Sequence, residues 1–125
     1  MKYRAISENH LYSKAYAKGK RFVCRSLAVY ILNDYAAERL RRANPEKVRI
    51  NRIGLTVSKK LGGAVIRNRV KRIIREAYRQ IDKEVGIRTG YLVVIVAREA
   101  AVNMKTQNIK RDLLFSLKKL NMLRK

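Results

Sequence analysis

Apolar residues alternate with polar ones, or run together, in several short stretches that are typical of β-strands. Residues 26–33 are apolar at both odd and even positions, which indicates a strand that is covered on both faces. Residues 48–58 alternate more regularly, and residues 91–98 form the most apolar run of the chain. Residues 22–23 follow a basic turn and are expected to form a short edge strand. The pattern therefore predicts four strands.

Three other stretches have apolar residues at helical spacing. Residues 8–17 follow Ser7, a favourable N-cap residue, and are closed by Gly19. A long helix is expected from Ala64 to about Glu84, and a last helix over residues 105–122. The expected order is therefore helix, three strands, helix, strand, helix.

This order predicts an α+β fold in which three helices pack against a single mixed sheet of four strands. Residues 34–44 are rich in helix formers and are stopped by Pro45, so they are expected to form a helical excursion between two strands. We expect residues 1–125 to form one domain, with residues 1–6 and 123–125 flexible.

The long helix separates its apolar side chains from its cations. At about 100° per residue, one face carries Ile66, Val70, Ile73, Ala77 and Ile81, with Ile74 at its margin. The opposite side carries Arg67, Asn68, Lys71, Arg72, Arg75 and Arg79. Like charges four residues apart destabilise a helix by about 0.2–0.5 kcal/mol per pair, and only Glu76 lies within this run to neutralise them. A bound polyanion would offset the repulsion, so this face is expected to bind phosphates rather than only water.

The overall charge points to the same kind of partner. Lys and Arg number 31 against 9 Asp and Glu, which gives a net charge of +22. Such an excess is typical of proteins that bind nucleic acid or an anionic membrane. No stretch approaches the ~20 apolar residues of a membrane span, and the first residues lack the apolar core of a secretory signal. A single cysteine, Cys24, fits a reducing compartment, so we expect a cytoplasmic protein bound to RNA or DNA.

The sequence offers no group of residues suited to catalysis or to metal binding. The carboxylates are scattered singly, apart from Asp82 and Glu84, whose spacing does not place them on one helical face. His10 is the only histidine and has no carboxylate or cysteine cluster nearby. Lys59 and Lys60 could contact phosphate, but no P-loop surrounds them. We therefore expect no catalytic residue and no metal ligand in this chain.

Residues 58–75 carry a resemblance to a known family. Their sequence, S-K-K-L-G-G-A-V-I-R-N-R-V-K-R-I-I-R, is similar to the signature of the bacterial ribonuclease P protein subunit, in which a Lys-Lys turn leads from a strand into an Arg-Asn-Arg helix. The match is dense from Arg52 to Arg79, and the order of elements fits the whole chain. The resemblance implies that the connection between the two strands flanking the long helix is left-handed.

The resemblance also implies a function. In that family an RNA subunit catalyses the Mg²⁺-dependent removal of the 5′ leader from precursor tRNA, and the protein assists it. The residues expected by resemblance to meet the catalytic RNA are Lys59, Lys60, Arg67, Asn68, Arg69, Lys71, Arg72 and Arg75. A cleft that holds the single-stranded leader would contain Tyr12, Tyr16, Phe22 and Tyr30. The expected partners are ribonuclease P RNA and precursor tRNA, with one protein monomer per RNA.

Other classes of nucleic-acid binder share part of this pattern. A ribosomal or other structural RNA-binding protein would have a similar charge and core, but it would bind RNA without affecting tRNA processing. A nucleoid-type DNA-binding protein fits less well, because the basic helix has no helix-turn-helix partner and no dimer seam is evident. A nuclease that acts alone would have to cut RNA without an RNA subunit.

Overall fold

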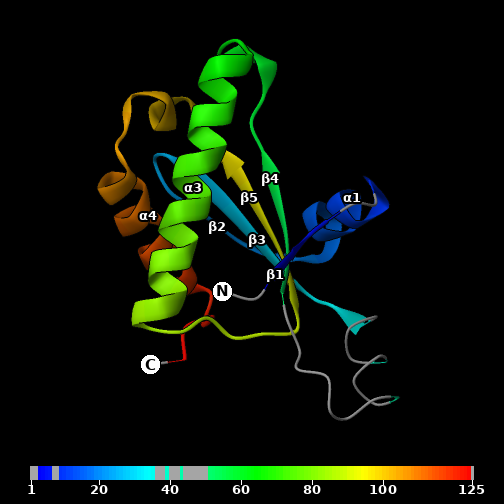
Figure 1. Ribbon diagram of the computed structural model, residues 1–125. Coiled ribbons are helices and arrows are strands. Elements are labelled where there is room, and N and C mark those ends of the chain that lie inside the picture. Colours follow the sequence, from blue (N-terminus) through cyan, green and yellow to red (C-terminus); the bar gives the residue numbers. More distant parts are fainter. Residues whose placement is uncertain (1–2, 7–8, 36–38, 40–42, 44–50, 125) are drawn as a thin grey trace.

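A five-stranded mixed sheet forms the framework of the computed structural model, which describes residues 3–6, 9–35, 39, 43 and 51–124 (Figure 1). In spatial order its strands are β1 (Tyr3–Ala5), β4 (Asn51–Thr56), β5 (Tyr91–Ala97), β3 (Leu27–Asn33) and β2 (Lys20–Val23). β5 pairs in parallel with β4 and antiparallel with β3, while β2 is antiparallel to β3 and β1 is parallel to β4. The predicted mixed sheet is therefore confirmed.

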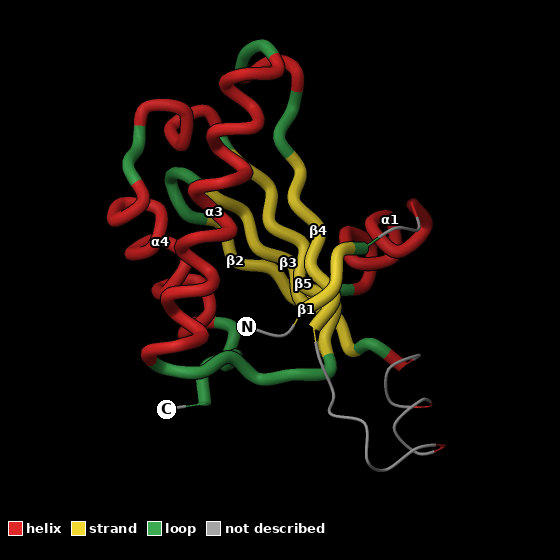
Figure 2. Tube along the Cα trace, in the orientation of Figure 1, coloured by secondary structure: helices red, strands yellow, loops and turns green. Residues whose placement is uncertain are grey.

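The helices lie on both faces of this sheet (Figures 1 and 2). α3 (Ala64–Glu84) and α4 (Thr106–Lys119) cover one face, and α1 (Asn9–Lys18) lies on the other. Alternate residues of β3 serve the two layers, since Val29 joins the core under α3 and α4 while Tyr30 packs with the residues of α1. No helix in the described part of the chain is long and apolar enough to cross a membrane.

The predicted α+β class and the three α-helices are confirmed for the residues that the structure describes. The bounds of α3 are those expected from the sequence, and α1 and α4 differ from their predicted bounds by one to three residues at each end. All four predicted strands are present. Residues 48–50, and most of the helical excursion predicted over residues 34–44, lie outside the described residues. The handedness of the connection from β4 through α3 to β5 stays a prediction.

Residues near both ends of the chain pair with other parts of the structure. Residues 3–5 form β1, which had not been predicted, and the N–H of Ile6 donates to Ile53 O at 3.0 Å. At the other end Leu123 forms a β-bridge with Ile87, and Arg124 Nε donates to the carbonyl oxygen of Ile87 at 3.1 Å. Residues 3–6 and 123–124 thus take part in backbone pairing, and the flexibility of the chain ends stays a prediction. Residues 1, 2 and 125 lie outside the described part.

The buried face of α3 is centred slightly away from the predicted stripe. Its buried side chains are Val70, Ile74, Ala77, Tyr78 and Ile81. Ile74 was expected at the margin but is fully buried, whereas Ile66 is 39% exposed because the first turn of α3 extends past the core. Tyr78 had not been assigned to the core, since its hydroxyl requires a buried hydrogen-bond partner.

That partner is Asn51, the buried first residue of β4. Its Nδ2 donates to Tyr78 Oη at 2.9 Å and to the carbonyl oxygen of Arg88 at 2.8 Å. Its Oδ1 accepts from the backbone N–H of Tyr91 at 3.0 Å. One amide side chain therefore links β4 to α3, to the loop that follows α3 and to the first residue of β5.

A buried ion pair lies on the other side of the same strand. Arg52 Nε donates to Asp34 Oδ2 at 2.6 Å, and a terminal guanidinium nitrogen donates to Asp34 Oδ1 at 2.8 Å. Asp34 is buried, and its backbone N–H donates to Gly90 O at 3.0 Å. These two parallel hydrogen bonds link the residue that follows β3 to β4.

Replacing Asn51 with Ala should destabilise the protein by about 2–4 kcal/mol, because it removes the hydrogen bonds that Asn51 makes with the buried Tyr78 hydroxyl, the Arg88 carbonyl and the Tyr91 N–H. Urea unfolding followed by circular dichroism measures the change in the free energy of unfolding. Gln107→Ala, an exposed amide in α4, is the matched control and should change it by less than about 0.5 kcal/mol. Equal effects of the two substitutions would contradict the role given to Asn51.

Candidate nucleic-acid interface

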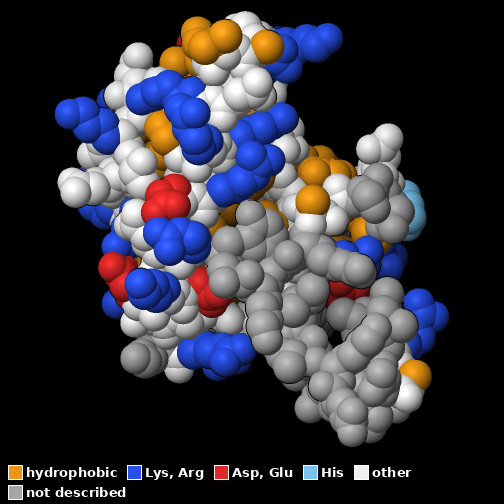
Figure 3. All heavy atoms as spheres, viewed as in Figure 1, with side chains coloured by type: hydrophobic (Ala, Val, Ile, Leu, Met, Phe, Trp, Pro, Cys, Tyr) orange, Lys and Arg blue, Asp and Glu red, His pale blue; other side chains and the backbone are white. Residues whose placement is uncertain are grey.

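Basic side chains gather along α3 on the face of the molecule shown in Figure 3, where few carboxylates interrupt them. The chain reaches α3 from β4 through a short 3₁₀ helix, η1 (Lys59–Leu61), and two glycines. Ser58 Oγ accepts from the backbone N–H of Lys60 at 3.2 Å, which caps η1 and leaves the side chains of Lys59 and Lys60 exposed. These two predicted residues therefore lie beside the start of the helix.

The first turn of α3 is open to an anion. Its N-cap, Gly63, provides no side-chain hydrogen bond, and the turn contains no acidic residue. The free backbone N–H groups and the helix dipole make this end electropositive. Gly62 has φ 149°, and a Cβ there would lie 2.8 Å from the Ile66 side chain, so glycine is needed for the sharp entry.

The predicted residues on α3 do not all play the same part. Asn68, Arg72 and Arg75 are exposed, and Lys71 is half-buried. Arg69 instead donates to the carbonyl oxygens of Val102 at 3.0 Å and Met104 at 3.3 Å, so its guanidinium fastens η2 (Glu99–Asn103) to α3.

Arg67 also points partly inward, since its Nε is buried. This atom has no hydrogen-bond partner among the described residues. Neither inward orientation follows from helical spacing alone. The cations fully presented by α3 at this end are therefore fewer than the sequence suggested.

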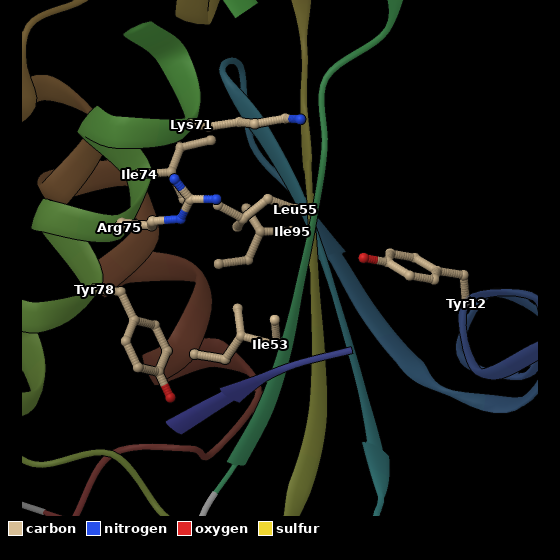
Figure 4. A pocket seen from close by; sticks show the side chains of 9 residues that line it. Tyr12, Ile53, Leu55, Lys71, Ile74, Arg75, Tyr78 and Ile95 are labelled. Atoms are coloured by element: carbon tan, nitrogen blue, oxygen red, sulfur yellow. The ribbon is translucent and has the colours of Figure 1, made fainter. Parts of the chain in front are cut away.

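Lys71 and Arg75 overhang a cavity of about 220 Å³ between α3 and the edge of the sheet (Figure 4). The apolar side chains that line it are Ala5, Ile53, Leu55, Ile74 and Ile95. Tyr78 lines the α3 side, and Tyr12 reaches the cavity from α1 on the other side of β4. The cavity combines two cations with an apolar floor, which suits a flat ring that carries a phosphate.

Tyr12 can lie against β4 because position 54 is glycine. A Cβ at Gly54 would lie 2.5–2.6 Å from three atoms of the Tyr12 side chain, Cε1, Cζ and Oη. Burial, followed by the neighbouring Tyr16, raises the pKa of Tyr12, so its hydroxyl stays neutral and can donate a hydrogen bond at physiological pH. Gly54 was not predicted as a site residue, although a glycine within a strand signals close approach of another group.

Tyr12, Tyr16 and Tyr30 form one aromatic cluster, which we call the tyrosine cleft. The rings of Tyr16 and Tyr30 meet edge to face with centroids 4.9 Å apart. Tyr16 Oη lies 3.1 Å from Thr56 Oγ1, and Tyr16 is 41% exposed. The cleft therefore presents aromatic surface to solvent beside β4, on the face opposite α3.

Phe22, the fourth residue predicted for this cleft, lies elsewhere. It is paired with Val29 in the β2–β3 ladder, so its side chain is on the face covered by α3 and α4. There its ring packs edge to face on Phe115 of α4, with centroids 5.5 Å apart. The placement of Phe22 in the cleft is therefore wrong, because the prediction did not follow the alternation of β2.

Arg79 is paired rather than available on the basic face. Its Nε donates to Glu76 Oε2 at 3.0 Å, and a terminal nitrogen donates to Glu76 Oε1 at 2.5 Å. These hydrogen bonds, and then one from Gln80, lower the pKa of Glu76 to about 2. The row of cations without an acidic partner on α3 is therefore interrupted after Arg75.

Gly54→Ala should displace the Tyr12 ring from β4, because the new methyl group would overlap it. Nuclear Overhauser effects between the Tyr12 ring and the backbone of β4 should disappear. Gly63→Ala is the control, since a Cβ at Gly63 meets no atom within 4 Å, and it should leave these signals unchanged. Retained Tyr12 signals in Gly54→Ala would contradict the packing described above.

The Glu76 carboxylate should titrate near pH 2, and Arg79→Ala should raise its pKa towards 4.5. Because the pKa is depressed in the folded protein, the stabilisation is present above the ordinary carboxyl pKa and is lost as pH falls through about 2. Carbon-13 NMR of the side-chain carboxyl measures this pKa. Lys83→Ala on the same helix is the control, and an equal rise there would argue against the specific pair.

The described residues contain no group of three or more His, Cys, Asp or Glu side chains that could hold a metal ion. The features present in the described part are instead those of a polyanion-binding surface: cations on α3, an open helix N-terminus and exposed tyrosine rings. Such a surface can neutralise phosphates and stack bases.

Comparisons with known proteins agree on one family. The family model for ribonuclease P matches residues 1–121. The ribonuclease P protein component of Listeria innocua serovar 6a is 37% identical over 117 residues, which cover 94% of this chain and 87% of that protein. The corresponding protein of Clostridium botulinum (strain Langeland) is also 37% identical, over 119 residues that cover 95% of this chain and 96% of that protein.

Solved structures resemble the fold as well. The RNase P protein of Staphylococcus aureus superposes with a TM-score of 0.77 at 29% identity, and the match covers 98% of this chain and all of that one. The Thermotoga maritima RNase P protein shares the fold, with a TM-score of 0.67 at 23% identity over 86% of this chain and 89% of that one. The chain therefore belongs to the ribonuclease P protein family.

Proposed function

We propose that this chain binds the catalytic RNA of ribonuclease P through α3 and holds the 5′ leader of precursor tRNA in the tyrosine cleft. The observation that carries the proposal is the position of these two surfaces on opposite sides of β4, with Tyr12 from one and Lys71 from the other lining a single cavity. The protein would thereby bring two RNA segments together.

The case for α3 is electrostatic. Lys71, Arg72 and Arg75 have no ion-pair or hydrogen-bond partner for their side chains within the described part of the chain, and Lys59 and Lys60 extend the cationic surface at the open helix end. Phosphates that bind here would relieve the repulsion within the helix and release counterions. Such neutralisation should lower the Mg²⁺ concentration that the RNA needs to fold and act.

The case for the cleft rests on exposed aromatic surface next to an open sheet edge. β1 pairs with β4 only as far as Ile53, so in the described part no strand covers the outer edge of β4 over residues 54–56. Tyr16 lies at this edge through its contact with Thr56. Stacking on such a ring is worth about 1–3 kcal/mol per base, and it would favour precursor tRNA over the mature product.

In this proposal the protein positions RNA, and the RNA partner carries out the cleavage. We assign Mg²⁺ to the RNA partner, where it would supply an activated water for hydrolysis. We also propose that one protein monomer acts with one RNA in the cytoplasm, a setting that suits the free thiol of Cys24.

At low Mg²⁺, precursor tRNA should be cleaved at the mature 5′ end only when this protein and a bacterial ribonuclease P RNA are both present. Gel analysis of labelled precursor measures the cleavage. Cleavage by the protein alone would overturn the assignment of catalysis to RNA. Tight RNA binding without any effect on cleavage would instead indicate a structural RNA-binding protein.

Tyr16→Ala with Tyr30→Ala should weaken binding of leader-bearing tRNA about 5- to 150-fold and spare binding of leaderless tRNA, because the stacking rings are removed. Phe115→Ala, an exposed aromatic on α4, is the matched control. Equal weakening with and without a leader in the tyrosine variant would count against the cleft.

Lys71→Ala with Arg75→Ala should instead make RNA binding less sensitive to salt. The slope of the logarithm of the binding constant against the logarithm of the salt concentration should fall by about 0.7–0.9 for each phosphate that the variant no longer neutralises.

A further inference from the structure

A second cavity, of about 380 Å³, opens at the end of the sheet where β3 ends and β5 begins. Its walls come from the end of α1, the start of β2 and the segment that follows α4. Neither the row on α3 nor the tyrosine cleft contributes a residue to it. Lys20, which lies opposite Ile31 in the β2–β3 ladder, is on the face covered by α3 and α4, whereas the tyrosine cleft is on the other face.

The polar lining of this cavity consists of donors without internal partners. Lys20 and Arg88 are exposed, and no hydrogen bond or ion pair in the described part of the chain uses either side chain. The same holds for the side-chain amides of Asn33 and Asn121. The described residues that line the cavity include no Asp or Glu, so the charge of this lining is positive.

Two tyrosines supply aromatic surface beside these donors. Tyr91 lies opposite Asn33 in the β3–β5 ladder and packs against the core, which fixes one side of the cavity. Tyr35 is 61% exposed at the rim, and Lys14 Nζ lies 6.0 Å from the centre of its ring. The lining therefore combines rings, amides and cations, and the volume falls in the range of about 300–1,000 Å³ that is usual for small-molecule sites.

We infer that this cavity binds a nucleotide of single-stranded RNA, with the base on the tyrosine rings, its edge hydrogen-bonded by Asn33 and Asn121, and its phosphate held by Lys20 and Arg88. The tyrosine rings can stack only on a flat base, and the side-chain amides of the two asparagines can bond only its polar edge. The lining therefore favours a nucleotide over a simple anion. An acidic peptide would use the cations but leave the rings and amides unmatched. This third RNA contact goes beyond the two surfaces of the proposed function.

Uridine 5′-monophosphate, titrated into ¹⁵N-labelled full-length protein, tests the inference. Saturable shifts are expected at the amides of Asn33, Arg88, Tyr91 and Asn121. Uridine alone and inorganic phosphate should each bind about 10-fold or more weakly, because each supplies only part of the interactions. Equal binding of phosphate, or of a short poly-glutamate peptide, would overturn the nucleotide assignment, as would shifts confined to Tyr12, Tyr16 and Tyr30.

The double variant Lys20→Gln, Arg88→Gln should show none of these shifts and stay folded, because the side chains it changes are exposed and make no internal hydrogen bond or ion pair with the described residues. Arg111→Gln, an exposed arginine on α4, should leave binding unchanged. Tyr35→Ala should weaken binding of the nucleotide and leave that of phosphate unaltered. An unchanged affinity in the double variant would refute the site.

With ribonuclease P RNA and a leader-length oligonucleotide as separate ligands, the same double variant identifies the RNA that supplies the nucleotide. With the RNA whose nucleotide occupies the cavity, the salt slope of binding should be lower by about 0.7–0.9 in the double variant than in the unchanged protein, because one phosphate is no longer held. With the other RNA the slope should be the same in both proteins. A slope unchanged with both RNAs would overturn the assignment to RNA. Nucleotide binding can be measured without any cleavage, so this outcome is separate from that of the proposed function.

Discussion

The parallel pairing of β4 with β5 is the constraint on which the arrangement of this protein depends. Parallel neighbours cannot be joined by a tight turn, so the chain must leave the sheet after Thr56, cross one face and return at Tyr91. The crossing segment is α3, and the side-chain amide of Asn51 fastens its C-terminal part and the segment that follows by bonding Tyr78, the Arg88 carbonyl and the Tyr91 N–H. The basic side chains are therefore presented by an element that is held at several points.

β4 also serves the opposite layer. Ile53 and Leu55 face α3, while Gly54 and Thr56 face α1, where they meet Tyr12 and Tyr16. Alternation along one strand thus places the cationic and aromatic surfaces back to back. β1 ends at Ala5, opposite Ile53, and beyond this point no strand of the described part of the chain pairs with the outer edge of β4, which lies beside both surfaces.

The long helix and the main strands could be predicted because their hydrophobic periods are strong and local. β1 could not, since three residues with little apolar alternation pair only because β4 offers an edge. The inward turn of Arg69 depends on carbonyls more than thirty residues away, and the place of Phe22 depends on the register of β2 with β3. Composition indicated the kinds of residue expected in the site, but tertiary contacts decide which of them remain available.

The pairing of Glu76 with Arg79 gives the basic face a defined length. From Arg67 to Arg75 the row extends about 12 Å at 1.5 Å per residue, and at Arg79 the charge is balanced by Glu76. Phosphates on one strand of a duplex are spaced by about 3.4 Å along the axis, so the row spans about three or four of them. This length exceeds the screening distance of about 8 Å at physiological ionic strength, so the two ends of the row act on different phosphates. A row of this length suits a polyanion in which several phosphates lie in line, and a single isolated phosphate would gain little from it.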